Sequence, residues 1–342
     1  MEPVVISMAD FDAWVGALIG GHKVIGVRAQ GDKFKFGELE SPADLRLDYD
    51  VTVLPPKYFL QPPCEQLLEF SGPADFKSLA GTGGAFILLG VHPYDMAAIS
   101  QMDKVFSSGN YDVHYMARRQ KALIIGCDVA RASPNVFAAC MNTAVWTRGY
   151  DILLTHLDGK YLAEAFTARG ASLLEAAPGI KKATPAELEA REKIREKNRK
   201  NLRRHKLRMT PDYLPELLEK SYDHPVWEEQ SKKCFSCGSC NLVCPTCYCF
   251  DVRDELRWDL RGGTRSRVWD GCMLREFAMV AGGHNFRKKL AERFRHRYYR
   301  KGKYVPGKIG EIACIGCGRC IGACVAKIAN PVYVYNRLLE DK

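Results

Sequence analysis

The sequence predicts an α+β protein, in which an N-terminal α/β domain precedes a C-terminal, mainly helical domain rich in cysteine. Two observations support this division. Short apolar runs alternate with helix-like stretches over residues 1–175, as in folds that interleave strands and helices. Eleven of the fourteen cysteines then fall between Cys234 and Cys324. A chain of 342 residues is long enough for about two domains.

The predicted N-terminal domain, residues 1–180, contains five strands and three helices. Each strand is a short apolar run bounded by polar or turn residues. The strands are predicted at Lys23–Arg28, Phe34–Leu39, Ala85–Val91, Ala122–Asp128 and Asp151–Leu157. The helices are predicted at Met8–Ile19, Tyr94–Val105 and Leu173–Ala177.

A charged helical connector is predicted over residues 181–222. Thr184-Pro-Ala-Glu187 fits a capping box with proline at the first helical position, so a helix should begin there and run to about Arg204. Few apolar residues mark it, which indicates that most of its faces are solvated. A second helix, Tyr213–Tyr222, leads into the cysteine-rich domain at residues 223–342.

The compartment in which the protein resides affects whether its cysteines form disulfides or bind metal. No apolar run approaches the roughly 20 residues of a membrane-spanning helix, so no membrane span is expected. Met1–Asp10 lacks the basic and apolar regions of a signal peptide. A cytoplasmic protein is therefore expected, and thiols in a reducing compartment bind metal more often than they form disulfides.

Two copies of one cysteine spacing occur in the C-terminal domain. They are Cys234-Phe-Ser-Cys237-Gly-Ser-Cys240-Asn-Leu-Val-Cys244-Pro and Cys314-Ile-Gly-Cys317-Gly-Arg-Cys320-Ile-Gly-Ala-Cys324. Both read C-x₂-C-x₂-C-x₃-C, the bacterial ferredoxin run in which the fourth cysteine ligates the other cluster. The duplication predicts a dicluster ferredoxin-like domain with two [4Fe–4S] clusters.

The ferredoxin pattern makes the ligand assignment concrete. Cluster 1 is assigned Cys234, Cys237, Cys240 and Cys324, and cluster 2 is assigned Cys314, Cys317, Cys320 and Cys244. Structural zinc is the alternative, but zinc sites favour two separated cysteine pairs over a run of four in one segment.

Three further cysteines leave two interpretations open. Cys247, Cys249 and Cys272 either are buried thiols lining the two clusters or hold a third cluster or metal ion. In the second case the fourth ligand would be His284, Cys127 or Cys140.

The chain resembles a known family. The first motif with its Cys-Pro-Thr-Cys-x-Cys tail, Trp269–Cys272, Ala281–Arg287 and Cys314–Cys324 are similar to the iron–sulfur subunit of anaerobic sulfite reductase and the beta subunit of cytosolic sulfhydrogenases. Gly90–Ile99 and Arg118–Cys127 extend the likeness into the N-terminal half.

The resemblance implies an electron-transfer subunit without substrate chemistry of its own. It implies one partner that carries flavin and oxidises NAD(P)H, and a second, catalytic partner that is a reductase or hydrogenase. Consistent with this, the chain has no complete G-x-G-x-x-G after a strand and no Walker A loop, so FAD and NAD(P) are expected only on a partner subunit.

The chain also departs from that family. Tyr94 stands where relatives have a cysteine, Val136-Phe-Ala138 stands near a Cys-Phe-Cys of relatives, and Val325 replaces the proline after the last ligand. Subunit-specific partners are therefore expected to differ from those of either named complex.

Two other classes of function have weaker support in the sequence. The alternative is an iron–sulfur nucleic-acid-binding protein, because two stretches, Glu187–Arg204 and Phe286–Lys303, are strongly basic. Runs of charge are, however, usually solvated faces or docking surfaces for acidic partners. The sequence also contains no motif of a nucleic-acid-binding fold. A stand-alone enzyme is disfavoured because His22, His92 and His114 lack a visible catalytic or metal partner.

Basic residues near the clusters should favour the reduced, more negative state of each cluster. Arg319, in the second motif, is therefore expected to raise the reduction potential.

Overall fold

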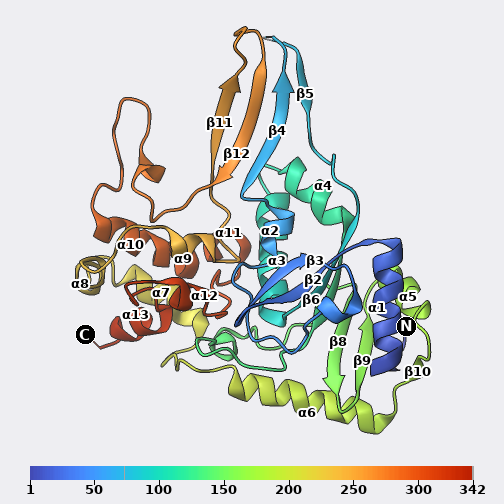
Figure 1. Ribbon diagram of the computed structural model, residues 1–342. Helices are drawn as coiled ribbons and strands as arrows, with labels where there is room; N and C mark the ends of the chain where they lie inside the picture. Colours follow the sequence, from blue (N-terminus) through green and yellow to red (C-terminus); the bar gives the residue numbers. More distant parts are fainter. Residues whose placement is uncertain (73, 341–342) are drawn as a thin grey trace.

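The computed structural model describes residues 1–72 and 74–340 and has the predicted α+β architecture (Figure 1). An eight-stranded sheet in the order β10-β1-β9-β8-β7-β6-β2-β3 forms the N-terminal domain. Its strands are β1 (Val4–Ser7), β2 (Lys23–Gln30), β3 (Lys33–Glu38), β6 (Phe86–Val91), β7 (Ala122–Cys127), β8 (Ile152–Leu157), β9 (Lys160–Ala165) and β10 (Lys181–Lys182). All five predicted strands are confirmed within two residues at each end.

The centre of this sheet is parallel, because β2, β6, β7 and β8 run side by side in chain order. Helices cover both faces, as a parallel sheet requires. One face packs against α1 (Met8–Gly21) and α5 (Ala168–Glu175), and the other against α3 (Pro93–Ser107) and α4 (Val113–Lys121). The helices predicted at Met8–Ile19 and Tyr94–Val105 are confirmed, whereas α5 begins five residues before its predicted start.

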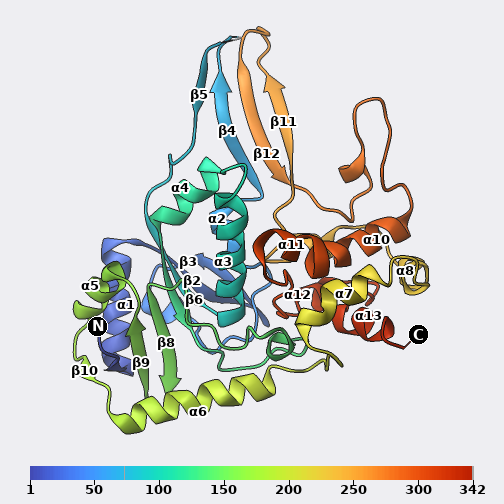
Figure 2. The same ribbon diagram turned by 180° about the vertical axis from the view of Figure 1, so that it is seen from behind.

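The predicted capping box is present at the start of α6 (Pro185–Asn201), where Thr184 and Glu187 cap each other. The helix runs beneath the large sheet in Figures 1 and 2. One face is not solvated: Arg195 is 4% exposed and pairs with Asp128 and Glu164. The sequence did not reveal this buried face because its anchor is a charged residue.

The C-terminal domain consists mainly of short helices beside the large sheet (Figure 1). Its core is rich in aromatic residues, including Trp227, Phe294, Tyr298 and Tyr335. The helix predicted at Tyr213–Tyr222 is shorter and follows a 3₁₀ turn at Pro211–Tyr213. The helices are α7 (Leu214–Glu219), α8 (Val226–Ser231), α9 (Ser239–Leu242), α10 (Leu290–Tyr299), a π-helical turn (Arg300–Tyr304), α11 (Pro306–Ile309), α12 (Arg319–Ala323) and α13 (Pro331–Arg337).

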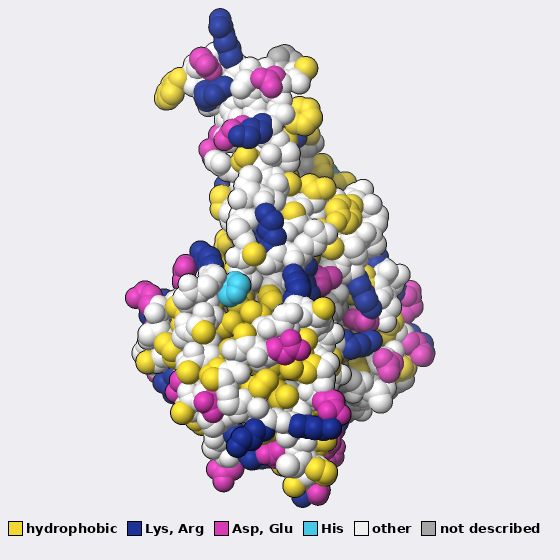
Figure 3. Space-filling view, turned by 90° about the vertical axis from the view of Figure 1, so that its right-hand side faces the viewer, with side chains coloured by type: hydrophobic (Ala, Val, Ile, Leu, Met, Phe, Trp, Pro, Cys, Tyr) yellow, Lys and Arg dark blue, Asp and Glu magenta, His cyan; other side chains and the backbone are white. Residues whose placement is uncertain are grey.

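A four-stranded antiparallel sheet, here called the arm, projects from the body (Figures 1 and 2). Its order is β11-β12-β4-β5, so it takes strands from both sides of the predicted connector. Figure 3 shows hydrophobic, basic and acidic side chains at its free end. Trp258, between β11 and β12, is fully exposed. The strands are β4 (Cys64–Phe70), β5 (Phe76–Ser78), β11 (Phe250–Leu256) and β12 (Gly263–Trp269).

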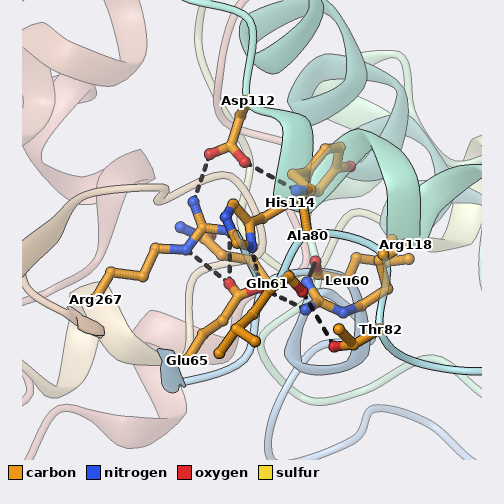
Figure 4. A network of polar contacts seen from close by, with 12 residues as sticks. Leu60, Gln61, Glu65, Ala80, Thr82, Asp112, His114, Arg118 and Arg267 are labelled. Atoms are coloured by element: carbon orange, nitrogen blue, oxygen red, sulfur yellow. Dashed lines mark hydrogen bonds and ion pairs between the residues drawn. The ribbon is translucent and has the colours of Figure 1, made fainter. Parts of the chain in front are cut away.

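A buried polar network holds the base of the arm to the body (Figure 4). Arg267 of β12 donates to Glu65 of β4, with Nε–Oε2 at 2.8 Å, and pairs with Asp112 at the start of α4. Arg118 and His114, both on α4, approach the same Glu65 carboxylate. The arm is therefore fixed at its base by charges from three separate segments.

The remaining elements are short. They are 3₁₀ turns at Pro42–Asp44, Ala138–Met141 and Glu276–Ala278, and the one-turn helix α2 (Lys57–Leu60).

No helix in the described part of the chain is long and apolar enough to cross a membrane.

Candidate metal centre

The two cysteine motifs adopt matching backbone conformations. Ser236 and Gly316 occupy the same motif position and have φ of 54° and 69°, and Gly238 and Gly318 have φ of 72° and 76°. Gly238 and Gly318 directly precede α9 and α12, which contact each other. Left-handed residues at two points turn each loop back on itself, so that its thiols converge.

Four cysteines surround a first cavity with about 430 Å³ of empty space. The structure places Cys324 of the second motif beside the first three cysteines of the first motif. The cavity is otherwise lined largely by apolar side chains, including Phe235, Met273 and Phe294. The four thiols of this first cysteine cavity belong to Cys234, Cys237, Cys240 and Cys324.

A second cavity of nearly the same size, about 420 Å³, is related to the first by the exchange of the fourth cysteine. Here Cys244 of the first motif joins three cysteines of the second. Ile315, Phe137 and Tyr335 supply apolar lining. The four thiols of this second cysteine cavity belong to Cys314, Cys317, Cys320 and Cys244.

The two cavities differ in depth. Cys237 is exposed at the first cavity, next to Phe235 and Val325, which are 71% and 73% exposed. Cys317 and Cys320 are buried at the second cavity, which lies against the N-terminal domain. The first cavity is therefore the one closer to solvent.

The protonation of the thiols follows this burial. Burial raises the pKa of Cys240 and of Cys314 to about 12. A hydrogen bond from Ser239 lowers the pKa of the exposed Cys237. Thiolates, not thiols, ligate metal, so the buried cysteines carry protons that metal binding has to displace.

Arg297 of α10 lines both cavities and also a third one described below. The side chain is 4% exposed, and its Nη2 lies 3.4 Å from the carbonyl oxygen of Cys240. Burial lowers the pKa of Arg297, but the sulfurs of Cys240 and Cys320 outweigh burial and raise it well above its usual value. No carboxylate among the described residues pairs with this guanidinium, so its charge is not compensated by a protein anion.

A second buried cation, Lys301, lies one helical turn further along. It is 6% exposed and its Nζ donates to Thr246 Oγ1 at 2.7 Å. That hydroxyl donates in turn to the carbonyl of Ala313 at 2.6 Å and lies 3.4 Å from Cys244 Sγ. Thr246 thus holds the ammonium group next to the fourth cysteine of the second cavity.

The four-thiol donor sets, the apolar linings and the uncompensated cations suit an anionic cofactor bound through sulfur. A [4Fe–4S]²⁺ core with four thiolates carries a charge of about −2 and is held in such surroundings. Among the described residues, no three His, Cys, Asp or Glu side chains are arranged to hold a single metal ion.

The remaining cysteines of the first motif's tail also converge. Cys247, Cys249 and Cys272 line a third cysteine cavity with about 330 Å³ of empty space. The fourth ligands considered from sequence do not line it: His284 is exposed beside Phe286, Cys127 is buried in β7, and the thiol of Cys140 donates to His205 O.

Arg319 has a buried partner that the sequence did not reveal. Its guanidinium forms a bidentate ion pair with Asp95, and both side chains are at most 2% exposed. The charge of Asp95 therefore offsets part of the effect of Arg319 on Cys317 of the second cavity. Tyr94 donates to Asp50 O at 3.0 Å and packs beside His92.

The three single histidines lie apart from the cysteine cavities. His92 is fully buried and stacks on Tyr49 at 3.9 Å between ring centroids, and burial holds its pKa well below the usual value. His22 is exposed, and His114 belongs to the network at the base of the arm.

Sequence reasoning missed the cations of the site. Arg293, Arg297 and Lys301 follow one another at intervals of four, are 4–6% exposed, and lie on the side of the helix that faces the cysteines. The i, i+4 spacing is the available signal, because residues so spaced share a helix face. The basic stretch 286–303 therefore does not present these three charges to solvent.

Comparisons with known proteins agree with this geometry. Residues 233–328 match the family described as a 4Fe-4S dicluster domain. The chain is 32% identical over 313 residues to sulfhydrogenase 2 subunit beta of Pyrococcus furiosus, and the match covers 90% of each chain. No solved structure gives a significant match. The protein belongs to the family of iron–sulfur electron-transfer subunits that includes this sulfhydrogenase beta subunit.

Proposed function

We propose that this protein relays single electrons through two [4Fe–4S] clusters, between a flavin-containing partner that oxidises NAD(P)H and a catalytic reductase or hydrogenase subunit. The observation that carries the proposal is the grouping of eight cysteines into two four-thiol cavities that share Arg297. A cytoplasmic location follows from the same proposal. Each cluster, when bound, would take up and release one electron at a time.

The chain's own residues have separate tasks in this relay. The cysteines bind the clusters, and Arg297 and Lys301 stabilise the added negative charge of the reduced state. Phe235 and Val325 lie over the first cavity, and we assign this exposed apolar surface to the contact with one partner. The second cavity is buried against the N-terminal domain, so the electron path passes between the cavities at Arg297.

The ligand assignment is tested by Cys240→Ser and Cys317→Ser, one for each cavity. Each variant should lose about four iron atoms per chain and the reduced-state paramagnetic signal of one cluster. Cys64→Ser is the matched control, because Cys64 is an exposed thiol on the arm outside all three cavities. A protein that carries zinc and negligible iron would end the proposal.

The partner assignment is tested by isolating the native complex from its source. We expect one co-purifying subunit that contains flavin and accepts electrons from NAD(P)H, and a second with reductase or hydrogenase activity. Isolated chain that reduces a substrate without any partner would contradict the relay and favour an enzyme. Steeply salt-sensitive binding to single-stranded nucleic acid would favour the other class that the sequence left open.

A further inference from the structure

The third cysteine cavity lies between the base of the arm and the end of α10, and its three cysteines are not among the eight of the two four-thiol cavities. Its three thiols come from two separate segments, Cys247 and Cys249 before β11 and Cys272 after β12. Cys272 is 5% exposed, so the cavity reaches into the interior. Its empty space, about 330 Å³, is about three-quarters of that in either four-thiol cavity.

Positive charge surrounds this cavity. Arg297, Arg300 and Lys301 line it, and Lys57 donates to the carbonyl of Cys247 at 2.6 Å while it is 3% exposed. No Asp or Glu lines the cavity, and none of these four cations pairs with a carboxylate in the part of the chain that the structure describes. Buried charges are normally paired or bound to metal centres, so this concentration of cations favours an anion in the cavity.

Asn241 fixes the thiols on one side. Its Nδ2 lies 3.5 Å from Cys272 Sγ and 3.7 Å from Cys247 Sγ, while its Oδ1 accepts a hydrogen bond from Met273 N at 3.1 Å. The amide is therefore oriented with its donor toward both sulfurs. Hydrogen bonds to sulfur of this kind stabilise thiolates and tune iron–sulfur clusters.

We propose that the third cysteine cavity binds a third iron–sulfur cluster through the thiolates of Cys247, Cys249 and Cys272. Three thiols lose their protons as three Fe–S bonds form. The cluster is a cubane whose fourth iron takes a ligand that is not a protein side chain, because no fourth cysteine and no His, Asp or Glu is among the described residues that line the cavity. This site lies beyond the two-cluster relay and does not depend on its ligand assignment.

The cluster would lie directly beside the second cavity. Thr246, directly before Cys247 in the chain, lines both the second and the third cavity, and its hydroxyl lies 3.4 Å from Cys244 Sγ. Arg297 lines all three cavities, and Lys301 lines the second and the third. The three sites therefore form one continuous electron path, with the third at the base of the arm.

Iron and sulfide analysis of anaerobically purified protein tests the proposal without any variant. About twelve iron atoms per chain are expected, against about eight for two cubanes alone. Cys249→Ser and Cys272→Ser should each lose about a third of the iron, with the signals of the other two clusters retained. Cys140→Ser, a thiol outside the cavity, should keep all of it.

The open iron provides a second readout. Brief oxidation with ferricyanide should remove the iron without a protein ligand and produce the paramagnetic signal of a [3Fe–4S] cluster. That signal should be present in the wild type and in Cys140→Ser, and absent from Cys249→Ser.

The inference fails if the wild type holds about eight iron atoms and Cys249→Ser is unchanged, and the two-cluster relay then still stands. Zinc bound stoichiometrically and lost in Cys249→Ser would likewise overturn it. If Cys249→Ser proves insoluble, the iron count and the ferricyanide signal of the wild type decide.

Discussion

Arg319 and Asp95 form a bidentate ion pair between the two domains, with Nη1–Oδ1 at 2.6 Å and Nη2–Oδ2 at 2.7 Å. Arg319 also donates through Nε to Thr52 O at 2.8 Å. Because Arg319 directly precedes Cys320, this pair fixes the second cysteine motif to the N-terminal domain. The carboxylate of Asp95 also offsets part of the positive charge that Arg319 brings to this motif.

Asp95→Asn should therefore destabilise the protein by about 3–5 kcal/mol, because it leaves a buried guanidinium without its counter-charge. The measurement is urea unfolding of the anaerobic holoprotein. Asp48→Asn is the matched control, since Arg46 and Asp48 form an equally bidentate pair on the surface. Exposed pairs contribute at most about 1 kcal/mol, so similar losses in the two variants would contradict this account.

Arg297→Met should lower the midpoint potentials of both proposed clusters by tens of millivolts, because the lost positive charge favoured the reduced, more negative state. Arg295→Met on the same helix is the control. Arg295 stacks over Tyr222 at 3.6 Å from the ring centroid and donates to its carbonyl, and it lines none of the cavities. Potentiometric titration of the two variants should separate them, and unchanged potentials in Arg297→Met would remove its assigned role.

Glu65→Gln should loosen the arm, since Arg267 is 2% exposed and would keep only Asp112 as an anionic partner. Hydrogen exchange should quicken in β4 and β12 and remain unchanged in α1. Asp254→Asn, which breaks an exposed ion pair with Arg265 on the same sheet, should leave exchange at the arm's base unaltered. Equal protection in wild type and Glu65→Gln would show that the network does not hold the arm.

His296 of α10 should make the free energy of unfolding fall as the pH is lowered. Burial, with Arg287 and Arg300 nearby, lowers the pKa of His296 to about 4. Its pKa in the unfolded chain is about 6.5, so the unfolded state takes up the proton first as pH falls. Stability from this group is therefore complete above about pH 6.5 and is lost toward pH 4.

His296→Gln should remove about 1 kcal/mol of the difference in unfolding free energy between pH 7 and pH 5, because solvent screens part of the effect at this half-buried side chain. Acid also weakens thiolate ligation, but that effect is common to wild type and variant. His22→Gln, at an exposed position, should keep the wild-type dependence. A pH profile of His296→Gln that matches the wild type would exclude this residue as the cause.

Short sequence patterns were enough to predict much of the fold and which cysteines lie close together. The buried strands of the large sheet are apolar runs, and the duplicated spacing already pairs Cys244 with the second motif. The arm was missed because every residue of β11 is exposed, so that no apolar run marks it. Arg297 was missed because a charged stretch normally indicates a solvated surface, and only the fold shows that its i, i+4 positions face the thiols.

Gly238 and Gly318 occupy equivalent positions in the two cysteine motifs. Gly238 and Gly318 both have left-handed φ, so alanine strains the backbone equally at either one. Their surroundings differ: a methyl group at position 318 would overlap the backbone carbonyl of Asn135, whereas at position 238 it would lie 2.9 Å from the end of the Leu274 side chain.

A leucine side chain can rotate away, but a carbonyl held in a packed loop cannot. Gly318→Ala should therefore displace the second motif and deplete the iron of the second cavity, while Gly238→Ala keeps most of the iron of the first. Iron per chain and the reduced-state spectrum of each variant measure this asymmetry. Equal iron loss in the two variants would show that the shared backbone strain, and not the contact with Asn135, governs how the loops hold their clusters.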